Sequence, residues 1–282
     1  MSFGRGTAGK GLALPCGRCI GCRLERARQW AVRIMHESKM HDANSFLTLT
    51  YDEEHLPPGG TLRVSDLQRF FKRLRARIAP QRIRFFACGE YGERLGRPHY
   101  HAIVFGWYPP DAVFLKGSGE LSVFTSSLLS AAWGLGHAVV GSVTPDSATY
   151  VANYSTKKVL GPSAEAHYQG RRPEFLVMSR RPGVGQSWVR QFFGDVFPSD
   201  EVIVKGMSCR PPRYYDQELL ARSPFEWYAL KARRAEQAEA LTELVEGTSM
   251  EVVPGRNARR LAVREKVARA KLALKRRNLE SA

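Results

Sequence analysis

The 282-residue chain has no apolar run long enough to cross a membrane, and its N-terminus has no apolar signal core. A spanning helix needs about 20 consecutive, mostly apolar residues. A secretory signal needs a shorter apolar stretch behind a basic start. We therefore expect a soluble protein that works inside a cell and makes no contact with a membrane.

Cysteine is scarce, and the five that occur form no even set that disulfides could pair: Cys16, Cys19, Cys22, Cys88 and Cys209. This pattern excludes the disulfide framework of a secreted domain. Cys16, Cys19 and Cys22 follow one another at intervals of three, and three thiolates with a fourth ligand would suit structural Zn²⁺. His36, His41 or Cys209 could complete such a site only through folding. Reduced structural thiols are the alternative, and the spacing gives little support to an iron–sulfur cluster.

Acidic residues are too few to balance the basic ones. Lys and Arg number 43 against 27 Asp and Glu, which gives a net charge of +16 and a pI of about 10. Such an excess is typical of proteins with a polyanionic partner, most often nucleic acid. Residues 256–282 hold ten Lys or Arg against Glu265 and Glu280, so half of the net charge lies in this tail.

A nucleotide-binding P-loop is also lacking. Gly4 to Lys10 imitates its start, but Gly11 occupies the position of the Ser or Thr that would hold magnesium. Only three residues precede Gly4, which leaves no room for the strand that a P-loop follows. We therefore expect no ATPase or helicase activity.

A histidine pair is the most informative feature present. Residues 97–105 read Arg-Pro-His-Tyr-His-Ala-Ile-Val-Phe, a β-forming run in which His99 and His101 point to one face and Tyr100 to the other. A strand from Ile83 to Glu90 precedes it across a turn with Gly92 and Gly96, so Glu90 can lie opposite the histidines. Two imidazoles and a carboxylate suit Mn²⁺ or Mg²⁺, a Lewis acid for a phosphoryl oxygen. Glu93 is an alternative ligand, and a polar surface strand without metal is the plainer interpretation.

A tyrosine pair forms the second constellation. Pro145 predicts the start of a helix that reaches about Leu160 and carries Tyr150 and Tyr154 on one face. The opposite stripe is small and apolar: Ala148, Val151, Ala152, Ser155 and Val159. We therefore expect the tyrosines to face away from the core, with Lys157 and Lys158 extending their face. A tyrosine oxygen can attack a phosphodiester, and a nearby Lys⁺ favours the phenolate. Two amphipathic tyrosines on a half-buried helix are the plainer interpretation.

The remaining periodicities complete an α+β pattern. They predict a helix from Arg23 to Glu37, a strand from Phe46 to Tyr51, a helix from Thr125 to Trp133 and a strand from His137 to Val143. Ser65 to Gln68 resembles a capping box that opens a helix. That helix presents a basic face suited to DNA: Arg69, Lys72, Arg73, Arg75 and Arg77. Strands joined by helices and by a tight hairpin favour helices packed on a mainly antiparallel sheet.

The ordered motifs resemble the replication initiators of small single-stranded DNA phages, the microviruses of gokushovirus type, which are rolling-circle HUH endonucleases. The likeness extends over about residues 14 to 190. It is carried by Pro15 to Arg23, Phe46 to Tyr51, Gly89 to Gly92, Arg97 to His101, and Tyr150 to Tyr154 with Lys157 and Lys158.

This resemblance implies a five-stranded antiparallel sheet of HUH, or RRM-like, type and a nicking reaction. His99, His101 and Glu90 would hold one Mg²⁺ or Mn²⁺ ion against single-stranded origin DNA. Tyr150 or Tyr154 would attack, leaving a 5′-phosphotyrosine link and a free 3′-hydroxyl as primer, and Lys157 and Lys158 match the family's basic residues. A host helicase and DNA polymerase would be partners in the bacterial cytoplasm.

We expect a flexible segment at 1–15, the endonuclease domain at 16–197, an extension of uncertain type at 198–228 and a basic helical or disordered tail at 229–282. Two alternatives remain open. A nucleic-acid-binding protein without catalysis explains the charge but gives the histidines and tyrosines no task. A transposase or relaxase of the same chemistry is the other, although relaxases usually have a third histidine and a tyrosine near the N-terminus.

Overall fold

The computed structural model describes residues 17, 19–92, 95–154, 158–159, 161–247, 262–263 and 265–271. The chain divides into two compact units, one of residues 26–215 and one of residues 1–25 with 216–282. The segment 1–15 and its imitation of a P-loop lie outside the described residues.

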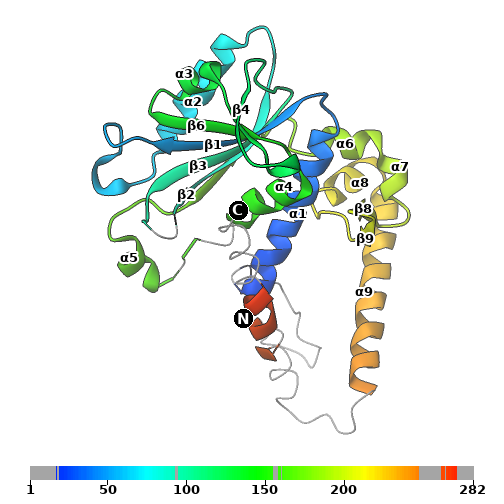
Figure 1. Cartoon of the computed structure of the whole chain (residues 1–282). Coiled ribbons are helices and arrows are strands. Elements are labelled where there is room, and N and C mark those ends of the chain that lie inside the picture. The colour runs from blue at the N-terminus through cyan, green and yellow to red at the C-terminus, as the bar shows by residue number, and fades with distance from the viewer. Residues whose placement is uncertain are drawn as a thin grey trace. The chain divides into compact units, whose positions relative to one another are not determined.

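A seven-stranded sheet is the centre of the 26–215 unit, and all of its strand pairs are antiparallel. Across the sheet the order is β4-β5-β6-β1-β3-β2-β7 (Figure 1). The strands are β1 (Asn44–Tyr51), β2 (Arg84–Tyr91), β3 (Pro98–Phe105), β4 (Val113–Lys116), β5 (Val123–Thr125), β6 (Gly136–Gly141) and β7 (Phe175–Met178).

The expected number of strands, five, was therefore wrong, whereas the antiparallel α+β class is confirmed. The additional strands lie toward the two edges of the sheet, where β4, β5 and β7 have three or four residues each. A strand that short shows too little alternation to be recognised in a sequence.

Helices cover both faces of the sheet. Helices α2 (Val64–Arg77) and α3 (Ser127–Trp133) lie on one face, and α1 (Ile20–Ser38) and α4 (Pro145–Asn153) on the other (Figure 1). Smaller elements complete the unit: the 3-10 turns η1 (Pro58–Gly60) and η2 (Gly119–Leu121), helices α5 (Ser163–Tyr168), α6 (Gln186–Gln191) and α7 (Phe193–Val196), and the hairpin of β8 (Val202–Val204) and β9 (Met207–Cys209).

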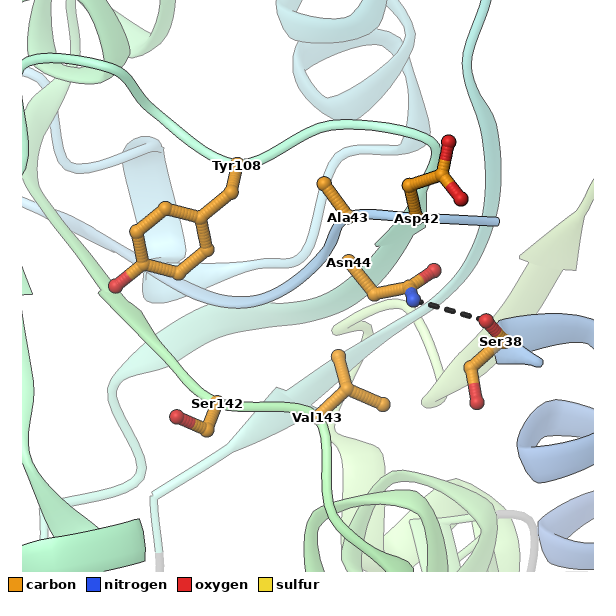
Figure 2. Close-up of a pocket in the computed structure, with 7 residues that line it drawn as sticks. All are labelled: Ser38, Asp42, Ala43, Asn44, Tyr108, Ser142 and Val143. Carbon is orange, nitrogen blue, oxygen red and sulfur yellow. Dashed lines mark hydrogen bonds between the residues drawn. The ribbon is translucent and has the colours of Figure 1, made fainter. Parts of the chain in front are cut away.

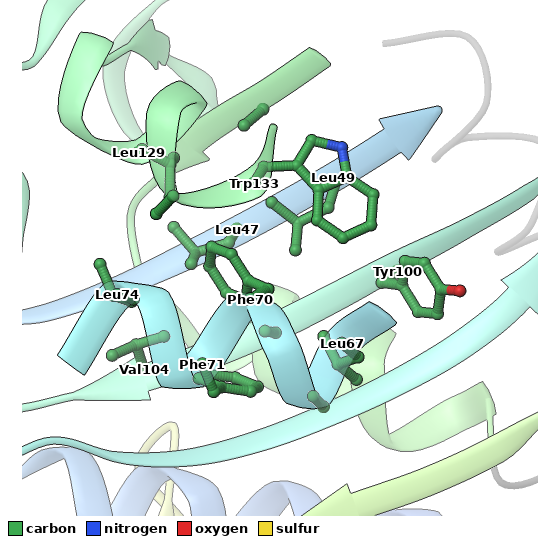
Figure 3. Packing of buried hydrophobic residues seen from close by; sticks show 14 of the residues in the cluster. Leu47, Leu49, Leu67, Phe70, Phe71, Leu74, Tyr100, Val104, Leu129 and Trp133 are labelled. Atoms are coloured by element: carbon green, nitrogen blue, oxygen red, sulfur yellow. The ribbon is translucent and has the colours of Figure 1, made fainter. Parts of the chain in front are cut away.

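The core under α2 and α3 follows from the alternation of β1. Leu47 and Leu49 are fully buried, and they meet Phe70 of α2 and Trp133 of α3 (Figure 3). Tyr100 of β3 lies in the same core. Its hydroxyl hydrogen-bonds the Tyr51 hydroxyl at 2.6 Å and donates to the Arg63 carbonyl at 2.9 Å. This network connects β1, β3 and the start of α2 behind the histidine strand.

The opposite core receives the other side chains of the same strands. Phe86, Cys88, Ile103 and Phe105 are buried here against α1 and α4, on the face that His99 and His101 also occupy. The predicted grouping of the β2 and β3 side chains is thus confirmed. The small stripe of α4 is confirmed as well, because its members Ala148, Val151 and Ala152 are completely buried.

The helix starts differ from the prediction. The N-cap of α2 is Arg63 without a side-chain hydrogen bond, and the Ser65 hydroxyl donates to Asp66 instead, so the expected capping box at Ser65 was wrong. A capping box does open α4, where Thr144 and Ser147 each accept a backbone N–H of the other. Pro145 occupies the first turn, as predicted.

The second unit contains α8 (Asp216–Arg222) and α9 (Pro224–Gly247). Arg234 joins these two helices through a bidentate ion pair with Asp216, at 2.8 and 3.0 Å. Most of the basic tail lies outside the described residues, and its described parts, 262–263 and 265–271, are helical. Within the described part of the chain, no helix is both long and apolar enough to cross a membrane.

Candidate metal and nucleophile site

Glu90, His99 and His101 converge on one point of the sheet. The Glu90 Oε1 atom lies 2.6 Å from His99 Nε2 and 3.1 Å from His101 Nε2. One potential ligand atom from each residue falls within 4.8 Å of the other two. This is the one such group of three His, Cys, Asp or Glu side chains among the described residues.

Strand register produces this convergence. Glu90 of β2 pairs with His99 of β3, and His101 lies two positions further along on the same face. The connecting turn is tight: Gly96 has a φ of +61°, a region that favours glycine, and its N–H bonds the Gly92 carbonyl. The alternative ligand Glu93 falls in this turn, outside the described residues.

The carboxylate is ionised despite its burial. Only 2% of Glu90 is exposed, and burial by itself would raise its pKa. Hydrogen bonds from His101 and His99, together with the nearby imidazole charge, outweigh that effect and lower the pKa of Glu90 to about 2. A negative charge is therefore held between two imidazole nitrogens.

The donor set fits a divalent cation. Two imidazole nitrogens and one carboxylate oxygen suit Mn²⁺ and also serve Mg²⁺, and three protein ligands leave positions open for substrate. The His99 side chain is 16% exposed and that of His101 is 6% exposed, so solvent reaches the group from the side of His99. We therefore treat these residues as a candidate metal site.

Both tyrosines of α4 pack against His101. The Tyr154 ring is nearly parallel to the imidazole at 5.4 Å, and the Tyr150 ring meets it edge-on at 5.1 Å. The two tyrosine rings are 4.9 Å apart. The expectation that they face away from the core was wrong, because Tyr154 is only 3% exposed and Tyr150 is half-buried. The helix is narrow enough for its tyrosines and its apolar stripe to pack on the same sheet.

The two lysines cannot be treated alike. Lys158 is exposed shortly after the end of α4, whereas Lys157 lies outside the described residues. The helix itself ends at Asn153 rather than near Leu160, which also lies outside them.

The basic side chains of α2 lie on the sheet face opposite the histidines. Lys72, Arg75 and Arg77 are exposed there, and Arg69 pairs with Asp66 at 3.1 Å. Arg73 instead donates to the carbonyls of Ala132 and Trp133, at 2.7 and 2.5 Å, so it caps the end of α3. All five remain candidates for DNA contact except that Arg73 has a structural task.

The cysteine trio is only partly within view, because Cys16 lies outside the described residues. Cys19 is exposed and Cys22 half-buried, both without a disulfide. Two suggested fourth ligands have other contacts: His36 hydrogen-bonds Tyr215 at 2.8 Å, and His41 pairs with Glu37 at 3.3 Å. A zinc site on the trio therefore remains a prediction.

Residues of β1 beside the site were missing from the candidates. The Thr48 hydroxyl lies 3.0 Å from His101 Nδ1, and the Phe46 ring is nearly parallel to the same imidazole at 5.5 Å. The alternation of Phe46 to Tyr51 indicates which side chains share a face. Which strand lies beside the histidines is a matter of tertiary pairing.

A hollow of about 410 Å³ occurs at the other end of the sheet (Figure 2). Asn44 lines it, and Asn44 pairs with Phe105 at the far end of β3 from His99. The other lining residues are Ser38, Asp42, Ala43, Tyr108, Ser142 and Val143. No member of the metal group or the tyrosine pair takes part.

Comparison with known proteins agrees with these features. Residues 44–159, which include both the histidines and the tyrosines, match the family described as replication-associated protein ORF2. Replication-associated protein VP4 of Bdellovibrio phage phiMH2K is 34% identical over 245 residues, which are 82% of this chain and 75% of that protein.

Two further relatives have similar identities. Replication-associated protein ORF4 of Chlamydia phage 1 is 33% identical over 72% of this chain, although the match spans only 52% of that protein. Replication-associated protein ORF2 of Spiroplasma virus 4 is 30% identical over 80% of this chain and 74% of that protein. No solved structure matches the chain. The chain belongs to the replication-associated protein family, named for ORF2, of the gokushovirus type of microvirus phages.

Proposed function

We propose that the protein is a replication initiation endonuclease that nicks single-stranded origin DNA and later rejoins the strand. The observation that carries this proposal is the joint placement of a three-ligand group, Glu90, His99 and His101, and of two tyrosine rings within 5.4 Å of the His101 ring. The endonuclease domain would comprise residues 16–197, with the following segments as appendages.

The chemistry is a transesterification. A tyrosine Oη attacks the scissile phosphorus and forms a phosphotyrosine bond to the 5′ side, while the bond to the 3′ oxygen breaks. The tyrosine loses its proton, and the departing 3′ oxygen gains one and becomes a free hydroxyl. A Mg²⁺ or Mn²⁺ ion held by Glu90, His99 and His101 would supply Lewis acidity toward the phosphoryl oxygens.

The two tyrosines differ in access, and this difference gives them an order. Tyr150 is half-buried, whereas Tyr154 is 3% exposed behind the imidazole. A phosphate arriving from solvent meets Tyr150 first, so we assign the first attack to Tyr150. Tyr154, 4.9 Å from the Tyr150 ring, would act on the regenerated origin or complete the wall of the site.

Positive charge would hold the DNA. The exposed side chains of α2 and the tail, with a net charge of +8 over residues 256–282, would contact phosphates without reading sequence. Lys157 and Lys158 would stabilise charge near the tyrosines. The free 3′-hydroxyl would prime a host DNA polymerase behind a host helicase, in rolling-circle replication in the bacterial cytoplasm.

The test is the formation of a covalent adduct. The purified protein is incubated with Mn²⁺ and its single-stranded cognate genome, and protein–DNA adducts that resist denaturation are quantified. The variants are Tyr150→Phe, Tyr154→Phe, their combination, and His99→Ala with His101→Ala. We expect an adduct for wild type and for Tyr154→Phe, and none for the other three proteins.

Each contrary result has a defined meaning. An adduct that survives Tyr150→Phe but not Tyr154→Phe would reverse the order of attack. Tight DNA binding without any adduct, on a verified origin, would favour the alternative of a non-catalytic binding protein. A reaction that needs one tyrosine throughout, including rejoining, would favour the single-tyrosine chemistry of a transposase.

A further inference from the structure

The two imidazoles of the metal group have different partners on the ring nitrogen that faces away from Glu90. His99 Nδ1 lies 3.1 Å from the Arg97 carbonyl oxygen, and His101 Nδ1 lies 3.0 Å from Thr48 Oγ1. Nε2 of each ring faces Glu90. Each imidazole is therefore held between Glu90 and one further oxygen.

The place of Thr48 follows from β1. Side chains of this strand alternate between the two sheet faces, and the antiparallel register pairs Thr48 with His101 and Thr50 with His99. The two threonines thus occupy equivalent positions beside the two histidines. Only the Thr48 hydroxyl bonds an imidazole, because the Thr50 hydroxyl donates to the His137 carbonyl at 3.4 Å.

Aromatic packing restricts the plane of the His101 ring but leaves its orientation within that plane open. The Phe46 and Tyr154 rings lie at 10° and 8° to the imidazole plane. A rotation of 180° about the Cβ–Cγ bond preserves this plane and places carbon atoms where Nδ1 and Nε2 were. Hydrogen bonds at the two nitrogens distinguish the two orientations, and Thr48 Oγ1 provides the one that does not involve a metal ligand.

A ligating nitrogen must present a lone pair, so a neutral His101 that binds a metal through Nε2 carries its proton on Nδ1. Thr48 Oγ1 can accept that proton in a hydrogen bond. Partners of this kind orient a ligating histidine and raise its basicity, and their loss typically weakens metal binding about 10- to 100-fold. We propose that Thr48 is a positioning residue that holds His101 with Nε2 toward the metal. This inference rests on the proposed metal site, and it adds a residue that touches neither metal nor DNA.

The test measures Mn²⁺ binding to the full-length protein by titration calorimetry, without DNA. Thr48→Val replaces the hydroxyl by a methyl group of similar size, and valine favours strands. Thr48→Ser retains a hydroxyl, and Thr50→Val makes the same change at the equivalent position beside His99. We expect Mn²⁺ binding at least about 10-fold weaker for Thr48→Val, within about threefold of wild type for Thr48→Ser, and unchanged for Thr50→Val.

Nitrogen chemical shifts of His101 provide a second measurement, which follows the ring and not the affinity. In the Mg²⁺-loaded wild-type protein we expect the proton on Nδ1, and a changed Nδ1 signal in Thr48→Val. Equal affinities for wild type and Thr48→Val, or equal losses for Thr48→Val and Thr50→Val, would overturn the proposal. Either result leaves the adduct assay for nicking unaffected, whereas a wild-type protein that binds no Mn²⁺ would remove the metal site and the role of Thr48 together.

Discussion

At the scale of single residues, the site depends on a carboxylate that stays charged although it is almost completely buried. Glu90 is stabilised in this form by the two imidazoles whose Nε2 atoms face it. A buried charge with such partners is costly to protonate and costly to leave unpaired. The same contacts keep the ligand atoms together before any metal arrives.

This arrangement predicts a pH dependence for the stability of the metal-free protein. The pKa of Glu90 is lowered from 4.5 to about 2 on folding. A lowered carboxyl pKa contributes stability that is present above pH 4.5 and is lost as the pH falls toward 2, by up to about 3 kcal/mol. Chemical unfolding of wild type and of Glu90→Gln at several pH values isolates this contribution. The stability difference between the two proteins should shift toward the variant below pH 4.5; a difference independent of pH would contradict the prediction.

At the scale of elements, the position of α4 decides where the tyrosines lie. Its start is defined by the reciprocal hydrogen bonds of Thr144 and Ser147 and by Pro145 in the first turn. Its small residues allow close approach to the sheet, since Ala148 and Ala152 are completely buried. The helix thereby brings Tyr150 and Tyr154 onto His101 of β3.

The two helix starts make a matched pair for mutation. Thr144→Ala removes the N-cap of α4 and should lower the free energy of unfolding by about 1 kcal/mol. Ser65→Ala at the start of α2 should change it by less than about 0.5 kcal/mol, because that hydroxyl caps no backbone N–H. Urea unfolding of both variants measures the contrast. Equal losses would show that the Thr144 hydroxyl has no particular task.

At the scale of the whole molecule, positive charge is concentrated at the end of the chain. Residues 256–282 contribute +8 of the total of +16. Contacts from such a segment go to phosphates, so they add affinity that depends on salt and carry little sequence information.

Deletion of residues 256–282 should therefore weaken binding to single-stranded DNA at low salt and flatten its salt dependence. The slope of log K against log salt should become smaller by about 0.7 for each phosphate that the shortened protein no longer neutralises. Fluorescence anisotropy at several salt concentrations, with origin and scrambled oligonucleotides, measures both quantities. An unchanged slope, or a loss of preference for the origin, would contradict a purely electrostatic role of the tail.

Much of the site could be predicted from the sequence because it depends on short-range periodicity. A spacing of two on a strand places His99 and His101 on one face whatever the rest of the fold, and the hairpin brings Glu90 opposite them. A spacing of four on a helix places Tyr150 and Tyr154 side by side. These relations depend on backbone geometry within a few residues.

The tertiary structure decided what periodicity cannot contain. Which face of α4 meets the sheet depends on packing against residues far away in the sequence, and so the burial of Tyr154 was predicted wrongly. The pairing of β1 with β3, which places Thr48 beside His101 across 53 positions of sequence, has the same origin. Strand identity and local spacing are properties of the chain, whereas the neighbours of a side chain are chosen by burial of the whole sheet between its helices.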